Sequence, residues 1–421
     1  MRRADVRLAF TALFALQAAA LGAQQARRTI VVSPASAIST VGEGIRRARD
    51  GDRILVRAGT YREPTIVVDR RVTIEGDSFP ALDGEGKREI MVVTANGVTV
   101  RGLRFMNVGA SHVEDRAAIR VTNAAGCVIE NNRFDNAFFG IYLGRVTGCL
   151  VSRNVMRGVR RTEESSGNGI HLWSSSDVRV VDNRISGHRD GLYFEFTRGA
   201  EARGNVSEEN VRYGLHFMYS DSCRYLDNTF RRNGAGVAVM YTKSVAMIGN
   251  RFEENRGSAA YGLLLKEIAD PVLERNVFRD NTVGLFADGA ARIQATGNTF
   301  SGNGWAVKLM ASTEGGRFSA NEFVGNTFDV SSNSRANSTV FDGNYWSEYE
   351  GYDLDRDGVG DVPHRPVRLF SLVVEDNEPA LILLRSLFIR LLDTAERVLP
   401  SLTPETLADA RPSMRRVPPE S

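Results

Sequence analysis

The chain has 421 residues, with 53 basic and 51 acidic side chains and a formal net charge of +2. Charges this evenly balanced create no strong basic field, so a nucleic-acid partner is not expected. The length would allow two or three average domains, but an internal repeat changes that expectation.

The first 23 residues are typical of a secretory signal peptide. Basic residues precede an apolar run from Leu8 to Leu21, and small residues follow at Gly22 and Ala23. No lipobox cysteine follows. We therefore expect a soluble exported protein, located in the periplasm.

Residues 24–60 are expected to cap the open end of a repeat array, as terminal repeats must. Thr29 to Val32 is predicted to be a strand. Thr40 to Asp50 is predicted to be an amphipathic helix, with Val41, Ile45 and Ala48 on one face.

A single repeat dominates the rest of the chain. An asparagine recurs about every 22 residues, at Asn132, Asn154, Asn183, Asn205, Asn228, Asn250, Asn276, Asn298 and Asn321. A second marker, a small residue before an aliphatic one, runs in phase at Gly140, Gly169, Gly191, Gly214, Gly236, Gly262, Gly284 and Ala306. This period is too short for helical-pair repeats and lacks the leucine-rich signature. It predicts an all-β fold, a right-handed single-stranded parallel β-helix over residues 61–345.

The marker residues set the register of each coil. The first and third residues after them are apolar and are expected to point inward, so the second and fourth point outward. The asparagines are expected at a turn, where asparagine tolerates left-handed backbone and can form a ladder of amide hydrogen bonds. A phenylalanine often follows two residues later and is expected to stack inside.

All three cysteines lie five residues before the asparagine of their coil, at an inward position. They are Cys127, Cys149 and Cys223. We interpret them as small buried hydrophobic residues. A disulfide between Cys127 and Cys149, on adjacent coils, would need backbone adjustment.

An acidic loop follows the repeat, within residues 346–376. Asp353, Asp355, Asp357 and Asp361 hold positions 1, 3, 5 and 9 of an EF-hand-like loop, with Gly358 at position 6. The bidentate glutamate expected at position 12 is missing. This pattern predicts a weak structural calcium site, and the alternative is an acidic turn without metal.

Residues 377–400 are predicted to form an amphipathic helix, in which apolar residues alternate with Arg385 and Arg390. It is too charged for a convincing membrane span. Residues 401–421 are rich in proline and polar residues, and disorder is predicted there.

Two outward columns contain side chains that could bind a soft metal. His216, Met218 and Met240 fall within one or two coils of each other, and Glu195 lies near them. Thioether and imidazole ligands suit cuprous copper. We expect a labile copper site here, with Glu195 balancing charge or orienting His216. The alternative is an aromatic and methionine patch for protein contact.

The same columns could instead bind a polysaccharide. Tyr142, Trp173 and Tyr193 offer flat stacking faces. A lyase or epimerase could draw its acid, base and cation from His188, Arg189, Asp190 and Glu195. No pair of carboxylates is clearly held at the separation that glycosidases use.

Several segments together resemble the NosD family of periplasmic accessory proteins for nitrous oxide reductase maturation. They are the export signal, the coils, Gly214–Ser220, Gly236–Tyr241, and Asn344–Ser347 before the acidic loop. The resemblance covers residues 29 to 390. It implies a non-catalytic role in building a copper-sulfide centre. It also implies three partners: the membrane subunit of an ABC transporter, a copper donor protein and the reductase itself.

Overall fold

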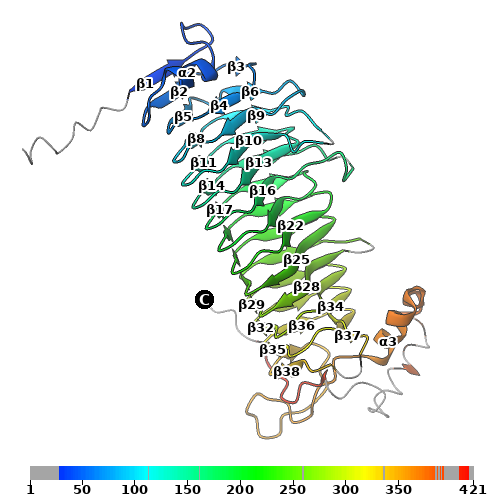
Figure 1. Cartoon of the computed structure of the whole chain (residues 1–421). Coiled ribbons are helices and arrows are strands. Elements are labelled where there is room, and N and C mark those ends of the chain that lie inside the picture. Colours follow the sequence, from blue (N-terminus) through cyan, green and yellow to red (C-terminus); the bar gives the residue numbers. More distant parts are fainter. Residues whose placement is uncertain are drawn as a thin grey trace, which may run out of the picture.

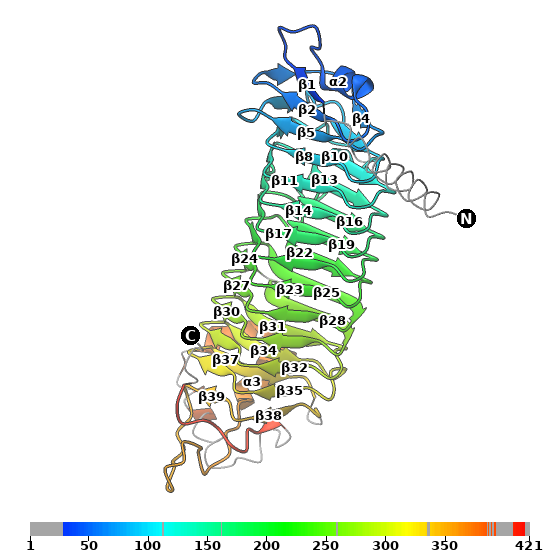
Figure 2. The same cartoon turned by 90° about the vertical axis from the view of Figure 1, so that its left-hand side faces the viewer.

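Three long parallel sheets wind around one axis in this computed structural model (Figures 1 and 2). It describes residues 28–111, 113–160, 162–257, 260–334, 337–384, 386, 389, 391–392 and 407–416. The expected signal peptide lies outside this range. Within it, the sheets contain 14, 13 and 12 strands, which we name sheets A, B and C, and each strand pairs with its equivalents one coil away. The predicted parallel β-helix is confirmed.

Each coil contributes one short strand to each sheet, with longer strands in sheet C. Sheet A contains β1 (Thr29–Val32), β2 (Arg53–Val56), β5 (Thr73–Gly76), β8 (Thr99–Arg101), β11 (Val128–Glu130), β14 (Leu150–Ser152), β17 (Arg179–Val181), β20 (Glu201–Arg203), β23 (Arg224–Leu226), β26 (Ala246–Ile248), β29 (Val272–Glu274), β32 (Gln294–Thr296), β35 (Arg317–Ser319) and β38 (Val340–Asp342). Sheet B contains β3 (Thr60–Tyr61), β6 (Ala81–Asp83), β9 (Arg104–Met106), β12 (Arg133–Asp135), β15 (Val155–Arg157), β18 (Arg184–Ser186), β21 (Val206–Glu208), β24 (Thr229–Arg231), β27 (Arg251–Glu253), β30 (Val277–Arg279), β33 (Thr299–Ser301), β36 (Glu322–Val324) and β39 (Tyr345–Trp346). Sheet C contains β4 (Ile66–Val68), β7 (Met91–Val93), β10 (Ala117–Thr122), β13 (Phe139–Gly144), β16 (Ile170–Trp173), β19 (Leu192–Glu195), β22 (Tyr213–Met218), β25 (Ala235–Lys243), β28 (Tyr261–Ala269), β31 (Val283–Asp288), β34 (Trp305–Leu309) and β37 (Phe328–Ser332).

Helix α2 (Val41–Arg47) covers the first coil and is shorter than predicted. The Thr40 hydroxyl accepts a hydrogen bond from the Glu43 amide. The Glu63 carboxylate, from a later coil, accepts hydrogen bonds from the amides of Val41 and Gly42, each at 2.9 Å. These contacts satisfy the first turn, where a helix favours negative charge. Strands β1 and β2 pair within sheet A, so the solenoid begins earlier than residue 61.

The asparagine column forms a continuous hydrogen-bond ladder. From Asn132 to Asn321, each backbone N–H and each side-chain Nδ2 donates to the Oδ1 of the asparagine one coil later. These bonds are 2.9–3.1 Å long. The left-handed residue is the one before the asparagine, such as Asn131 and Arg153, so that part of the prediction was wrong. The polar asparagine side chains can be buried because their amide groups are hydrogen-bonded within the ladder.

The phenylalanine column stacks inside, as predicted. Ring centroids from Phe230 to Phe323 lie 4.6–5.7 Å apart, and Trp346 ends the stack at 4.1 Å from Phe323. Offset stacks of this kind add to the free energy gained by burying the rings.

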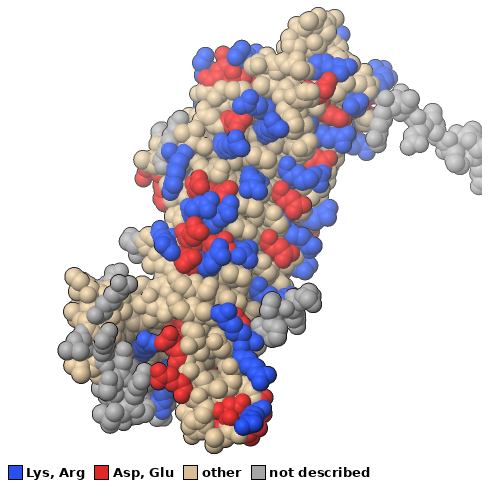
Figure 3. Space-filling view, turned by 180° about the vertical axis from the view of Figure 1, so that it is seen from behind, with Lys and Arg blue, Asp and Glu red and all other residues tan. Residues whose placement is uncertain are grey.

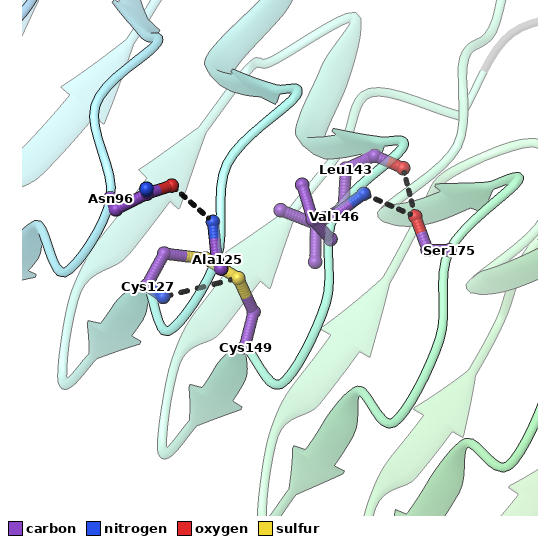
Figure 4. Close-up of a disulfide and its surroundings, with 7 residues drawn as sticks. All are labelled: Asn96, Ala125, Cys127, Leu143, Val146, Cys149 and Ser175. Atoms are coloured by element: carbon purple, nitrogen blue, oxygen red, sulfur yellow. Dashed lines mark hydrogen bonds between the residues drawn. A yellow bond between two sulfur atoms is a disulfide. The ribbon is translucent and has the colours of Figure 1, made fainter.

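Cysteines 127 and 149 form a disulfide rather than serving as two separate buried thiols (Figure 4). Their Cα atoms are 4.6 Å apart on adjacent coils, within the usual range for a bridge. The required backbone spacing is therefore already present in the stacked coils. Cys223 remains a buried thiol, and burial raises its pKa to about 12.

The far end of the solenoid is covered by two segments. Helix α3 (Leu369–Asp376) lies beside β37 (Figure 1). Phe370 and Val374 of this helix join a small apolar cluster with Phe328 of β37. The expected helix over residues 377–400 begins as the 3-10 helix η1 (Glu378–Leu383), and much of the remainder lies outside the described residues.

Residues 407–416 contradict the expected disordered tail. This segment, the C-terminal strap, pairs with the last coil through Phe341 with Asp409 and Tyr345 with Ser413. Leu407 and Asp409 are fully buried. The strap is ordered because it supplies partners that the final coil would otherwise lack.

Candidate functional site

The candidate site lies on the outer face of sheet C, where strands β16, β19, β22 and β25 run side by side. His171, Tyr193, His216 and Ala238 are successive register partners in one column. Trp173, Glu195, Met218 and Met240 are partners in the next. Alternate residues such as Leu215 and Phe217 are fully buried in the core. The strand pairing thus brings His216, Met218 and Met240 together on one face.

His216 is more enclosed than the sequence suggests, because its side chain lies among aromatic rings. Its ring centroid is 4.8 Å from those of both Tyr193 and Tyr213, and only 7% of the residue is exposed. The same column continues through His171, whose ring lies 4.6 Å from Tyr193. Burial lowers the pKa of His171 to about 3, so that imidazole stays neutral. The two imidazoles are therefore held rigidly by their neighbours.

Asp190, rather than Glu195, is the carboxylate beside His216. Its Oδ2 is 3.6 Å from His216 Nδ1, and the residue is fully buried. Arg212 donates two hydrogen bonds to the same carboxylate, at 2.9 and 2.6 Å, and its Nη2 lies 3.4 Å from His216 Nδ1. The expectation that Glu195 orients His216 was wrong, because Glu195 pairs in register with Met218, one column away.

The ionisation of Asp190 is set by opposing effects. Burial alone would raise its pKa, but interactions with His216 and Arg212 outweigh burial, and the pKa falls below the ordinary value. A buried carboxylate is kept charged only when it is paired in this way. Nδ1 of His216 faces this pair. In the tautomer whose Nδ1 proton points to Asp190, Nε2 is the nitrogen left for a ligand.

The two methionines form a half-buried pair on adjacent coils. The Tyr193 hydroxyl lies 3.9 Å from Met218 Sδ. Met240 is the register partner of Met218, at a strand spacing of about 4.8 Å. The next coil has Lys266, which forms an ion pair with Asp288 at 3.2 Å. The thioether sulfurs of Met218 and Met240 are therefore bordered on one side by charged residues.

The acidic loop offers a separate group of oxygen ligands. Carboxylate oxygens of Asp353, Asp355 and Asp357 lie within 4.8 Å of one another. Asp361 is not part of that group, and it accepts a hydrogen bond from the Leu354 amide at 2.8 Å. Amides of Asp357 and Gly358 donate to Asp353, so the loop is already turned around its first carboxylate.

Two of the residues considered for polysaccharide chemistry, His188 and Asp190, are buried. His188 is buried, and burial lowers its pKa to about 4. Asp190 is held by Arg212. The ring centroids of Tyr142 and Tyr193 lie 4.8 and 4.6 Å from that of His171. His188 and Asp190 are therefore not free at the surface, whereas Glu195 and Trp173 are partly exposed.

Sequence reasoning missed two contributors to this face. Arg212 and Tyr213 precede a marker glycine, outside the columns that were searched, yet both contact His216. A second asparagine ladder also escaped notice, at Asn210, Asn233, Asn255, Asn281, Asn303 and Asn326. Its period was visible in the sequence, five residues after the first column.

Comparison with known proteins identifies the family. The model for the family described as "Periplasmic copper-binding protein (NosD)" matches residues 152–351. A Pseudomonas aeruginosa protein named "Probable ABC transporter binding protein NosD" is 34% identical over 393 residues, covering 89% of this chain and 91% of the relative. The chain belongs to the NosD family. A Stutzerimonas stutzeri NosD of the same name is 29% identical, covering 87% of this chain and 88% of the relative.

Solved structures of low identity share the fold alone. The Dettilon tailspike protein aligns with a TM-score of 0.53 at 14% identity, covering 73% of this chain and 69% of the tailspike. The Streptococcus pneumoniae surface adhesin PfbA aligns with a TM-score of 0.50 at 12% identity, covering 80% and 97%. The NosD family is described as periplasmic. Among the residues that the structure describes, none forms a helix long and apolar enough to cross a membrane.

Proposed function

We propose that this NosD-family protein binds cuprous copper transiently through His216, Met218 and Met240. It would pass the ion on during assembly of the copper-sulfide centre of nitrous oxide reductase. The observation that carries the proposal is the alignment of one imidazole and two thioethers on adjacent strands of sheet C. Glu195 lies in the same column and can balance the charge of the ion.

The chemistry of this donor set favours a soft ion that is later released. Neutral thioethers and imidazole bind cuprous copper well but discriminate against hard cations. Asp190 and Arg212 lie beside Nδ1 of His216, where metal-bound imidazoles commonly have polar partners that orient the ring. Met218 and Met240 remain partly exposed, so an acceptor protein could reach an ion held there.

A double substitution tests the copper site. Met218→Leu with Met240→Leu keeps volume and apolarity, so the fold should survive. Met310→Leu is the matched control, because Met310 occupies the same outward column while Lys308 stands where His216 would be. In an anaerobic titration against a cuprous chelator, the double variant should bind at least tenfold more weakly than the parent. Equal affinity of parent and double variant would disprove the site.

An ABC transporter is the proposed membrane partner, together with a copper donor protein and the reductase. Support comes from the apolar side chains of the C-terminal segment, where Ile382 and Leu391 are exposed. Large exposed apolar residues often mark protein contacts. Truncation is a poor test because it also removes the strap that covers the solenoid. Ile382→Ser with Leu391→Ser keeps the strap, and it should reduce co-purification with the transporter while thermal unfolding stays unchanged.

Calcium is proposed as a structural ion of the acidic loop. Asp353, Asp355 and Asp357 offer convergent oxygens, which is the ligand chemistry that calcium prefers. The strap is hydrogen-bonded to this loop. The Gly360 amide donates to the Pro412 carbonyl, and the Met414 amide donates to the Gly358 carbonyl. A bound cation would therefore stabilise the far end of the solenoid.

A further inference from the structure

Three aromatic side chains form a stacked row on the surface beside the candidate metal site. Phe196 and Tyr219 have ring centroids 5.3 Å apart, and Tyr219 and Tyr241 have centroids 5.1 Å apart, with the planes within 14° of parallel. Their exposed fractions are 51%, 46% and 40%. Each follows directly after Glu195, Met218 or Met240, so the row runs beside these three residues.

The fold does not require aromatic residues at these positions. All three adopt left-handed backbone, with φ of 53°, 48° and 55°, which is uncommon and costly for bulky side chains. Neighbouring coils have Ser174 and Glu267 at the equivalent position, with φ of 49° and 51°. Because serine and glutamate adopt the same left-handed backbone there, this backbone conformation does not account for the aromatic rings.

One side of the row differs from the outer faces of sheets A and B in its residue types. Sheets A and B carry ion pairs between coils, including Arg53–Glu75, Arg101–Glu75, Arg231–Glu208 and Arg279–Glu253. Basic and acidic side chains accordingly intermingle on the face seen from behind (Figure 3). Beside the row, Trp173, Met218 and Met240 are half-buried instead, whereas Asp221, Lys243 and Glu267 line a hollow together with Tyr241. Aromatic residues and methionine are the types enriched at protein interfaces.

The geometry of the row limits what can bind there. The ring faces are mostly occupied by one another, so a sugar ring would find little free aromatic face on which to stack. All three residues are partly exposed, and two of them carry a phenolic hydroxyl, which suits a polypeptide with apolar groups and carbonyl acceptors. The exposed area of the three residues is on the order of 300 Å², well below the roughly 800 Å² per partner of a stable complex. A short-lived contact fits this area better than a permanent dimer.

We propose that the row of Phe196, Tyr219 and Tyr241 is a docking surface for a protein that exchanges the soft metal with His216, Met218 and Met240. Such a partner would present its own thiolate, thioether or imidazole ligands next to a small apolar patch. Docking on the row places those ligands directly over the methionine pair. This inference rests on the proposed copper function and identifies the partner by its chemistry.

The test replaces all three rings by serine, the residue that the adjacent coil already has at this turn. Val340→Ser is the matched control, since Val340 is an equally exposed apolar residue on sheet A. The purified triple variant should bind cuprous copper within twofold of the parent in a chelator titration, because the ligands are untouched. Copper in nitrous oxide reductase isolated from cells that make the triple variant should fall at least fivefold, with no change for Val340→Ser.

Three results would overturn the docking proposal. Full copper loading of the reductase by the triple variant would show that the row is not needed. A large loss of copper affinity would place the rings in the metal site itself. A parent that sediments as a dimer, with a monomeric variant, would assign the row to a second copy of the chain. Absence of copper binding by the parent protein is a separate result, and it would refute the copper function instead.

Discussion

Replacing Asp409 by alanine should open the far end of the solenoid. Asp409 Oδ2 accepts hydrogen bonds from the backbone N–H of Asn344 at 2.9 Å, from Asn344 Nδ2 at 2.9 Å and from Trp346 Nε1 at 3.1 Å. Its Oδ1 accepts from the amides of Gly343 and Arg411, at 3.0 and 3.1 Å. The strap thus supplies the acceptor that a further asparagine would have supplied, and it ends the ladder.

The expected loss in the free energy of unfolding follows from the hydrogen-bond donors that Asp409→Ala leaves without an acceptor. Asn344 and Trp346 are buried, and a buried donor without an acceptor costs about 1–3 kcal/mol. Water that enters the opened end will form hydrogen bonds with some of these donors and offset part of the cost. We therefore expect the free energy of unfolding to fall by about 3–5 kcal/mol in total. In a repeat protein the loss is felt first by neighbouring coils, so the last coils should open before the rest unfolds.

Two variants distinguish the contribution of the hydrogen-bond ladder to stability from that of the surface ion pair of the strap. Asp409→Asn keeps one acceptor oxygen and should lose only about 1–2 kcal/mol. Arg411→Ala removes an exposed ion pair with Asp342 and should cost less than about 1 kcal/mol. Hydrogen exchange at the Asn344 amide and the Trp346 indole, with urea unfolding, measures each effect. Parent-like exchange and stability in Asp409→Ala would refute the reasoning.

Three further predictions concern the surroundings of His216, a buried aspartate of β37 and the acidic loop. Asp190→Asn should weaken cuprous copper binding by roughly 10–100-fold and change the ring ¹⁵N shifts of His216. Unchanged shifts would mean that the carboxylate does not orient the imidazole. Burial raises the pKa of Asp329 to about 6, so the folded protein binds this proton more tightly than the unfolded chain does. Stability should therefore fall as pH rises from about 4 through 6, and Asp329→Asn should remove that slope and add roughly 1–3 kcal/mol at pH 7.5. Chelators should lower the melting temperature of the parent but not of Asp355→Ala, and an equal response in both would exclude the loop as a calcium site.

The sequence by itself determined the repeat, and with it the fold and the outward face. Equivalent residues of a parallel β-helix stack one coil apart, so a period of 22 residues fixes neighbours without further information. That is why the stacking of Phe252 on Phe278 and the pairing of Met218 with Met240 could both be predicted. The second asparagine ladder follows the same period and could have been found by the same reasoning.

Only the tertiary structure decided contacts that do not follow the period. Side-chain reach, rather than register, selects Asp190 as the carboxylate beside His216 and leaves Glu195 in the neighbouring column. Asp409 meets Asn344 across 65 residues of sequence, where the chain leaves the solenoid and returns. No repeat connects these segments, because the strap is held by burial and by donors that the last coil leaves unpaired. The period therefore specifies the solenoid. Long-range packing specifies how the end of the solenoid is covered and which residues surround His216.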